Sequence, residues 1–193
     1  MSKRLSSPPI EYEQPWANNL VRDIETEFQY LESAIQNPVS GRQYGSFYDT
    51  TTQSIASITT AYPITINTTS ENSGVAIVGG SRITVGAIGV YNVQFSAQLL
   101  STDTSIQDAK IWLRKNGVDL AQTAGDVNVP NRHSGINGQT IASWNYVLTM
   151  SAGSYLEFYW AGTSTNLSIA PIAAGTSPVS PASPSMIVTV CQV

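Results

Sequence analysis

The sequence predicts a mainly β fold: a jelly-roll β-sandwich of about ten antiparallel strands, preceded by an N-terminal arm and one amphipathic α-helix. Charged residues are concentrated at the start, with ten in residues 1–42 and only twelve in the rest of the chain. Apolar residues follow a helical spacing before residue 40, whereas short alternating segments separated by Gly, Asn, Pro and Ser come after it. We therefore predict an arm and an anchoring helix in residues 1–40 and a jelly-roll domain in residues 41–193.

The helix is predicted between Pro15 and Asn37. Proline suits the first turn of a helix, and an asparagine followed by proline ends one. Six apolar residues are spaced alternately by four and three positions, which places them on one stripe: Ala17, Val21, Ile24, Phe28, Leu31 and Ile35. The spacing predicts about five helical turns with a continuous apolar stripe.

This stripe is expected to pack on something other than copies of itself. In a parallel homotrimeric coiled coil, Glu25, Glu27 and Glu32 would flank the apolar seam with no Lys or Arg to complement them. The stripe is therefore predicted to dock on the body of its own domain or on a different protein. Four residues are the candidate anchor residues: Trp16, Leu20, Phe28 and Leu31.

The rest of the chain is predicted to form strands, with no helical period between them. The predicted strands are YGSFY, YPITIN, VAIV, RITV, VYNVQFSAQLL, AKIWLRK, VDLAQT, SWNYVLTM, YLEFYWAG, LSIAPI and SMIVTVCQV. Asn116-Gly117 is the strongest hairpin signal, because this pair favours a tight turn between antiparallel strands. The last strand is apolar on almost every position, so it is predicted to be central, with Cys191 as a small buried residue.

The segment ITVGAIGVYNVQFSAQLL, residues 83–100, contains no charged side chain and alternates strictly in its second half. One side of the predicted strand is apolar and should face the core. The other side carries neutral amides and a hydroxyl, where a solvent-facing strand usually carries Lys, Glu or Arg. This composition indicates a neighbouring surface rather than bulk water.

Two long polar or proline-rich segments, residues 124–139 and 170–185, are predicted to be loops. Loops of this length in a domain are often functional surfaces, although a tolerated surface excursion explains them equally well.

Composition excludes several classes of partner. The net charge is −4 and the nine Lys and Arg residues are scattered, so nucleic acid is not an expected partner. No apolar run is long enough to span a membrane, and MSKRLSSPPIEYE lacks the apolar core of a signal peptide. We therefore expect a soluble protein with no secretory route.

The residues give no positive case for an enzyme. His133 is the only histidine and lies in a polar loop, and Cys191 has no base beside it in the sequence. Asp103 and Asp108 flank oxygen-bearing side chains that could hold Ca²⁺, but aspartates that start turns are commoner. We predict no catalytic residue, cofactor or metal.

Several aromatic residues could form a surface on which a saccharide stacks, but core or interface positions are the commoner explanation at strand spacing. These residues are Trp112, Trp144, Tyr146, Phe158, Tyr159 and Trp160.

The order of four segments resembles the jelly roll of tumour necrosis factor and of complement globular heads. The segments are RITVGAIGVYNVQFSAQL, AKIWLRKNGVDLAQT, NYVLTMSAGSYLEFYWAG and the final SMIVTV. Together with YGSFYDTTTQ and PSMIVTV, residues 44–193 are also similar to structural proteins of tailed bacteriophages, especially those with photosynthetic or aquatic hosts. The resemblance implies a homotrimer around an axis.

In such a trimer, the neutral side of the strand is the candidate subunit interface, because neutral amides can pair there without desolvating charge. Its candidate residues are Asn92, Gln94, Ser96 and Gln98. The competing prediction places Trp112, Tyr146 or Tyr159 at the axis instead.

The resulting hypothesis is a non-enzymatic capsid decoration or cement protein on the outside of a phage head, made in the host cytoplasm. The arm and helix, from Leu5 to Ile35, would anchor it to the major capsid protein. The alternative is a fibre or receptor-binding component whose loops recognise a host surface. A capsid-associated hydrolase is a remote third class, because no acid/base pair is indicated.

Overall fold

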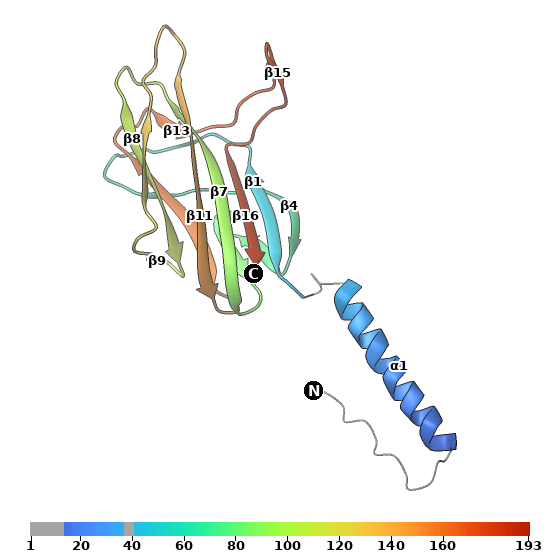
Figure 1. The fold of residues 1–193 in the computed structure, drawn as a ribbon. Coiled ribbons are helices and arrows are strands. Elements are labelled where there is room, and N and C mark those ends of the chain that lie inside the picture. Colours follow the sequence, from blue (N-terminus) through green and yellow to red (C-terminus); the bar gives the residue numbers. More distant parts are fainter. Residues whose placement is uncertain (1–13, 37–40) are drawn as a thin grey trace. The chain divides into compact units, whose positions relative to one another are not determined.

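The fold is described from a computed structural model, in which residues 14–36 and 41–193 are described (Figure 1). The chain divides into two units, Met1–Gly41 and Arg42–Val193. In the first unit, helix α1 (Gln14–Gln36) begins one residue before the predicted Pro15 and ends one residue before Asn37. The arm from Leu5, and the side chains of Glu32 and Ile35, lie outside the described residues.

The second unit is mainly β and contains two seven-stranded antiparallel sheets, which we name sheet A and sheet B. Sheet A has the order β2 (Gln53–Ser54), β13 (Leu167–Ile169), β7 (Gly89–Ser101), β16 (Met186–Gln192), β1 (Tyr44–Asp49) and β4 (Thr68–Ser73), with β11 (Gly138–Met150) also paired to β7. Sheet B has the order β10 (Gly125–Val129), β8 (Gln107–Lys115), β12 (Tyr155–Gly162), β6 (Arg82–Val85) and β5 (Val75–Val78), with β3 (Tyr62–Pro63) paired to β12 and β9 (Val118–Asp119) paired to β8. A small hairpin joins β14 (Gly175–Thr176) to β15 (Val179–Ser180).

The core lies between the two sheets, because strands of both alternate buried and exposed residues. Phe95 of β7 is central: its ring centroid lies 4.8 Å from that of Phe158 on β12 and 5.3 Å from that of Trp144 on β11. Burial of a side chain of this size contributes about 1.5–3 kcal/mol relative to exposure. The apolar side of the strand predicted within residues 83–100 therefore faces the core, as expected.

Local sequence signals located the clearest turn. Asn116 and Gly117 connect β8 to β9 with φ angles of 51° and 81°, the left-handed conformation that an Asn-Gly turn favours. The last strand is central, as predicted, because β16 pairs with β7 on one side and β1 on the other.

Several predictions of secondary structure were wrong. Residues 124–139 are not one loop, since residues 125–129 form β10 and β11 begins at Gly138. The 170–185 segment contains the β14–β15 hairpin. Strand β4, TTSENS, was missed because it pairs on the edge of sheet A and has no apolar alternation.

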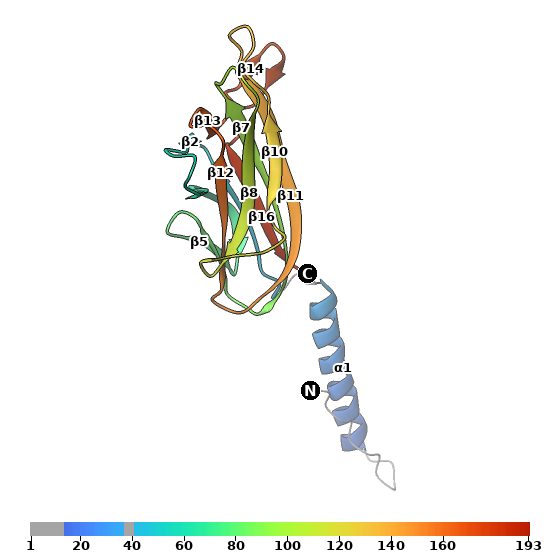
Figure 2. The same ribbon diagram turned by 90° about the vertical axis from the view of Figure 1, so that its left-hand side faces the viewer.

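The β unit has two distinct ends (Figure 2). The chain enters β1 beside the C-terminal residues, where the backbone N–H of Gln192 donates to the carbonyl of Gln43 over 2.8 Å. The β10–β11 connection and the 170–185 segment lie together at the opposite end (Figures 1 and 2). We call these the junction end and the distal end.

Candidate interaction surfaces

The outer face of sheet A carries no charged side chain on four adjacent strands, β11, β7, β16 and β1. We name this surface the neutral face. It is formed by Gln139, Ile141, Ser143, Asn145, Val147 and Thr149 of β11; Val90, Asn92, Gln94, Ser96, Gln98 and Leu100 of β7; Ile187, Thr189 and Cys191 of β16; and Tyr44, Ser46 and Tyr48 of β1. One charged residue beside this face is Glu71, which lies opposite Ser46 on the edge strand β4.

The strand register brings the four candidate interface residues together with residues that sequence reasoning missed. Gln94 lies between Asn145 and Thr189. In the next row, Ser96 lies between Ser143 and Ile187, and a shallow hollow of about 150 Å³ opens between these rows. Apolar side chains border the amides, since Ile141 is 59% exposed and Val147 is 64% exposed. The predicted strand from Ser143 contained most of these β11 residues, but the sequence did not show that this strand pairs with β7.

The competing set of interface residues is divided between different environments. Trp112 and Tyr159 lie on the outer face of sheet B, with ring centroids 6.2 Å apart. Tyr146 is half-buried against the core, and its hydroxyl donates to the carbonyl of Thr123 over 2.7 Å. Burial raises the pKa of Tyr146. These three residues therefore do not form one surface.

The outer face of sheet B carries the ion pairs of the β unit. Lys110 contacts Asp126 at 2.6 Å, and Arg114 contacts Asp119 at 2.5 Å. Hydrogen bonds from Arg114 and from the indole of Trp112 lower the pKa of Asp119. Because these ion pairs are exposed, water weakens their attraction and they contribute little to the free energy of unfolding.

Helix α1 presents an exposed apolar stripe. Val21, Ile24, Phe28 and Leu31 are 54%, 40%, 61% and 52% exposed. Two of the four candidate anchor residues, Phe28 and Leu31, thus lie on this stripe, whereas Trp16 and Leu20 are half-buried. A helix with this much exposed apolar surface is suited to packing against a partner.

Gln43 fixes the start of the β unit to its last strand. Its side-chain carbonyl accepts hydrogen bonds from the backbone N–H groups of Gly86 and Ala87 and from the hydroxyl of Tyr91, each at 2.9 Å. Its backbone N–H donates to the side chain of Gln192 over 3.1 Å. The start of the β unit is therefore held by the β6–β7 connection together with strands β7 and β16.

The distal end carries the two segments predicted as candidate recognition loops. The 170–185 segment is closed by paired backbone hydrogen bonds between Ile172 and Ser183, of 2.9 and 2.8 Å, and Val179 at its hairpin is 88% exposed. Its far side is fixed to the body, because the backbone N–H of Ser185 donates to the carbonyl of Asp49 over 2.8 Å. The base of the segment is thus held by backbone hydrogen bonds, and its hairpin is exposed.

The two side chains considered for nucleophilic chemistry lie far apart. His133 is exposed in the β10–β11 connection, whereas Cys191 pairs in register with Asn92 near the junction end. The register along β7 separates them by about 30 Å. The prediction that Cys191 is buried was wrong: its side chain alternates outward from β16 and is exposed on the neutral face.

The aspartates considered for Ca²⁺ make other contacts. Asp103 accepts a hydrogen bond from the hydroxyl of Ser164 over 2.5 Å, which lowers the pKa of the carboxyl. Asp108 accepts from the side chain of Asn128. Within residues 14–36 and 41–193, no three His, Cys, Asp or Glu side chains gather as a metal site.

Helix α1 is not apolar enough to cross a membrane, and it is the one long helix among the described residues. No protein-family model matches the chain, and no curated protein sequence matches it either.

Proposed function

We propose that the protein is a non-enzymatic structural component of a bacteriophage virion, a homotrimeric decoration or cement protein on the outside of the head. The observation that carries the proposal is the presence of two surfaces of different composition among the described residues, the neutral face and the apolar stripe of α1. One surface suits copies of the chain, and the other suits a different protein. The resemblance of residues 44–193 to phage structural proteins is the reason for proposing a phage virion as the particle.

We further propose that the β unit is a jelly roll. The order of its longer strands supports this topology: β4-β1-β16-β7-β11 in sheet A and β5-β6-β12-β8-β10 in sheet B. Consecutive long strands alternate between the sheets, so that β7 is followed by β8 and β11 by β12 in the opposite layer. Such crossings are typical of two sheets joined by Greek-key connections.

The neutral face is the proposed contact between the three β units. Around a three-fold axis every side chain meets two copies of itself or of its neighbours, so a charged residue there would face like charge. Amides and hydroxyls avoid this repulsion, and Ile141, Val147 and Ile187 provide apolar surface beside them. A polar interface with apolar residues of this kind is ordinary for protein–protein contacts.

The stripe of α1 is the proposed anchor to the major capsid protein. Cement action follows from burial of this stripe across the junctions of assembled capsomers, because a ligand that binds the assembled shell alone stabilises that state. Gln43 would hold the start of the β unit in place, through its hydrogen bonds with Gly86, Ala87 and Tyr91, when the anchor is bound.

The anchor is tested by a double substitution on the stripe, Phe28→Ala with Leu31→Ala. We expect the variant to lose at least tenfold in affinity for capsids that lack the protein, because two exposed apolar side chains would each be removed from the contact. Co-sedimentation with those capsids measures the loss. The matched control is Thr26→Ala with Gln29→Ala on the same helix, which should bind like the unaltered chain. Equal binding of both variants would show that the stripe is not the anchor.

A receptor-binding component is the second candidate, favoured by the position of both recognition segments at the distal end (Figure 2). Quantitative mass spectrometry of purified virions separates the two. A copy number within a few-fold of the major capsid protein is expected for a cement protein. A handful of copies per particle would instead assign the protein to a fibre and transfer the binding role to the 130–137 and 170–185 segments.

A further inference from the structure

A small hollow lies on the outer face of sheet B, over the paired strands β8 and β12. Its volume is about 310 Å³, near the lower end of the range for sites that bind small molecules. It is lined by Ile58, Asp108, Lys110, Ala161, Gly162 and Thr163. The floor is apolar because Ala161 and Gly162 place no large side chain there, and Ile58, which is 56% exposed, forms an apolar wall. We name it the β8–β12 hollow.

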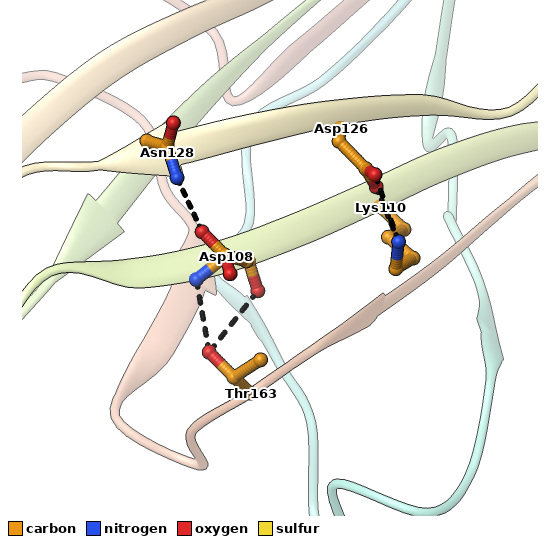
Figure 3. A network of polar contacts seen from close by, with 5 residues as sticks. All are labelled: Asp108, Lys110, Asp126, Asn128 and Thr163. Atoms are coloured by element: carbon orange, nitrogen blue, oxygen red, sulfur yellow. Dashed lines mark hydrogen bonds and ion pairs between the residues drawn. The ribbon is translucent and has the colours of Figure 1, made fainter.

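The polar groups around the hollow are already held in place (Figure 3). Asp108 accepts a hydrogen bond from the side chain of Asn128, and its backbone N–H donates to the hydroxyl of Thr163 over 2.9 Å. The ammonium of Lys110 contacts both carboxylate oxygens of Asp126, at 2.6 and 2.9 Å. A ligand would therefore meet acceptors and a donor in fixed positions, which limits the ordering cost of binding.

Aromatic rings continue the same surface. Trp112 and Tyr159 are partners in the β8–β12 register and occupy the next outward positions beyond the pair Lys110 and Ala161. This places them about 7 Å along the strands from the hollow. Trp112 is fixed by its indole N–H, which donates to Asp119 over 2.7 Å, and the guanidinium of Arg114 lies 3.9 Å from the centroid of the Tyr159 ring.

Charge and topology restrict what this surface could bind. The single ammonium is neutralised by Asp126, and Asp108 adds a second carboxylate, so a phosphate or carboxylate ligand would meet net repulsion. A peptide strand added to a sheet needs a free edge, whereas β8 and β12 both have partners on each side. A neutral ring with one apolar face and several hydroxyls satisfies the apolar floor and the polar rim together.

We propose that the β8–β12 hollow binds a neutral saccharide. The C–H face of one sugar ring packs on Ala161 and Ile58. Its hydroxyls exchange hydrogen bonds with Asp108, Lys110 and Thr163, and a second ring reaches Trp112. The proposal goes beyond the structural role proposed above and depends neither on trimer formation nor on capsid binding, since it uses the opposite face of the β unit.

The test uses the full chain on an array of immobilised neutral oligosaccharides and bacterial surface polysaccharides, followed by calorimetric titration with the best-bound oligosaccharide. Ala161→Leu fills the floor of the hollow and should weaken binding at least tenfold. Ala76→Leu is the matched control, because it makes the same change at an exposed position of β5 in sheet B, and it should bind like the unaltered chain.

A second variant keeps the test decisive if Ala161→Leu folds poorly by circular dichroism. Lys110→Met retains the aliphatic stem but removes the donor, and it should weaken binding several-fold. Absence of binding to every neutral saccharide by the unaltered chain would overturn the proposal, as would binding restricted to anionic polysaccharides or binding that neither variant weakens. Loss of capsid binding has no bearing on this result.

Discussion

The two outer faces of the β unit differ in their use of charge. The neutral face of sheet A has no charged residue across β11, β7, β16 and β1, although it includes the two longest strands. The outer face of sheet B pairs Lys110 with Asp126 and Arg114 with Asp119, and Glu157 is buried beside Arg82 at 3.7 Å. Both sheets belong to one domain, and the strands of both alternate between buried and outward residues. Packing of the core therefore does not require their outer faces to differ in charge.

The difference in charge between the two faces bears on what each face can contact. Charged side chains on a solvent-facing sheet maintain solubility and discourage association, and sheet B follows that rule. Sheet A departs from it over its whole central area, and isoleucine and valine accompany the amides there. Leaving a surface of this composition in water costs little free energy. The same surface can be buried against a copy of itself without desolvating any charge. The comparison thus supports the proposed association through sheet A and leaves the outer face of sheet B to solvent or to the proposed ligand.

The largest expected effect comes from placing a charge on the neutral face. Gln94→Glu changes no more than one neutral amide to a carboxylate, in the row between Asn145 and Thr189. In the proposed trimer it brings three like charges together, which costs several kcal/mol when such charges are juxtaposed at an interface. We expect the association to weaken at least tenfold, as measured by sedimentation equilibrium.

Gln122→Glu is the matched control, because it makes the same chemical change at an exposed turn outside the neutral face. This variant should associate like the unaltered chain. Cys191 gives an independent readout: its thiol is exposed in a single β unit but lies on the neutral face, so alkylation should be slower in the trimer and faster in Gln94→Glu. An unchanged trimer with a fully reactive thiol would place the interface elsewhere and remove the contrast between the faces.

Local patterns allowed much of this fold to be predicted. The helix limits followed from Pro15 and Asn37, and the β8–β9 hairpin followed from Asn116-Gly117, because each signal acts within a few residues. Strand β4 could not be found this way. It is polar on both faces, and its local sequence does not favour a strand. It is a strand because it pairs with β1.

The candidate surfaces show the same limit. The alternation around Gln94 revealed one strand of the neutral face, but the register that sets Asn145 and Thr189 beside it is a long-range property. Cys191 was predicted to be buried because almost every residue of the last strand is apolar. The alternation along β16 instead places its side chain on the outer face. The β8–β12 hollow was not predicted at all, since Ile58, Lys110 and Ala161 come from three separate segments.

The smallest expected effect comes from neutralising a paired charge on sheet B. In Asp119→Asn, the side chain can still accept from Trp112 but loses its ion pair with Arg114. Exposed pairs contribute about 1 kcal/mol or less, so the melting temperature at pH 7 should fall by at most about 4 °C and association should not change. Thermal unfolding monitored by circular dichroism measures the shift, and Glu71→Gln, a carboxylate without an ion pair among the described residues, is the control.

The pH dependence of this difference follows from the lowered pKa of Asp119 in the folded protein. A carboxyl whose pKa is lower when folded than when unfolded stabilises the protein above its unfolded pKa of about 3.9, and this contribution disappears as the pH falls through the folded value. The melting temperatures of Asp119→Asn and the unaltered chain should therefore differ at pH 5–7 and converge at lower pH. The proposed trimer should show no matching transition, because the neutral face contains no carboxylate to titrate. A trimer that dissociated over the same acidic range would mean that charged residues of sheet B take part in its interface.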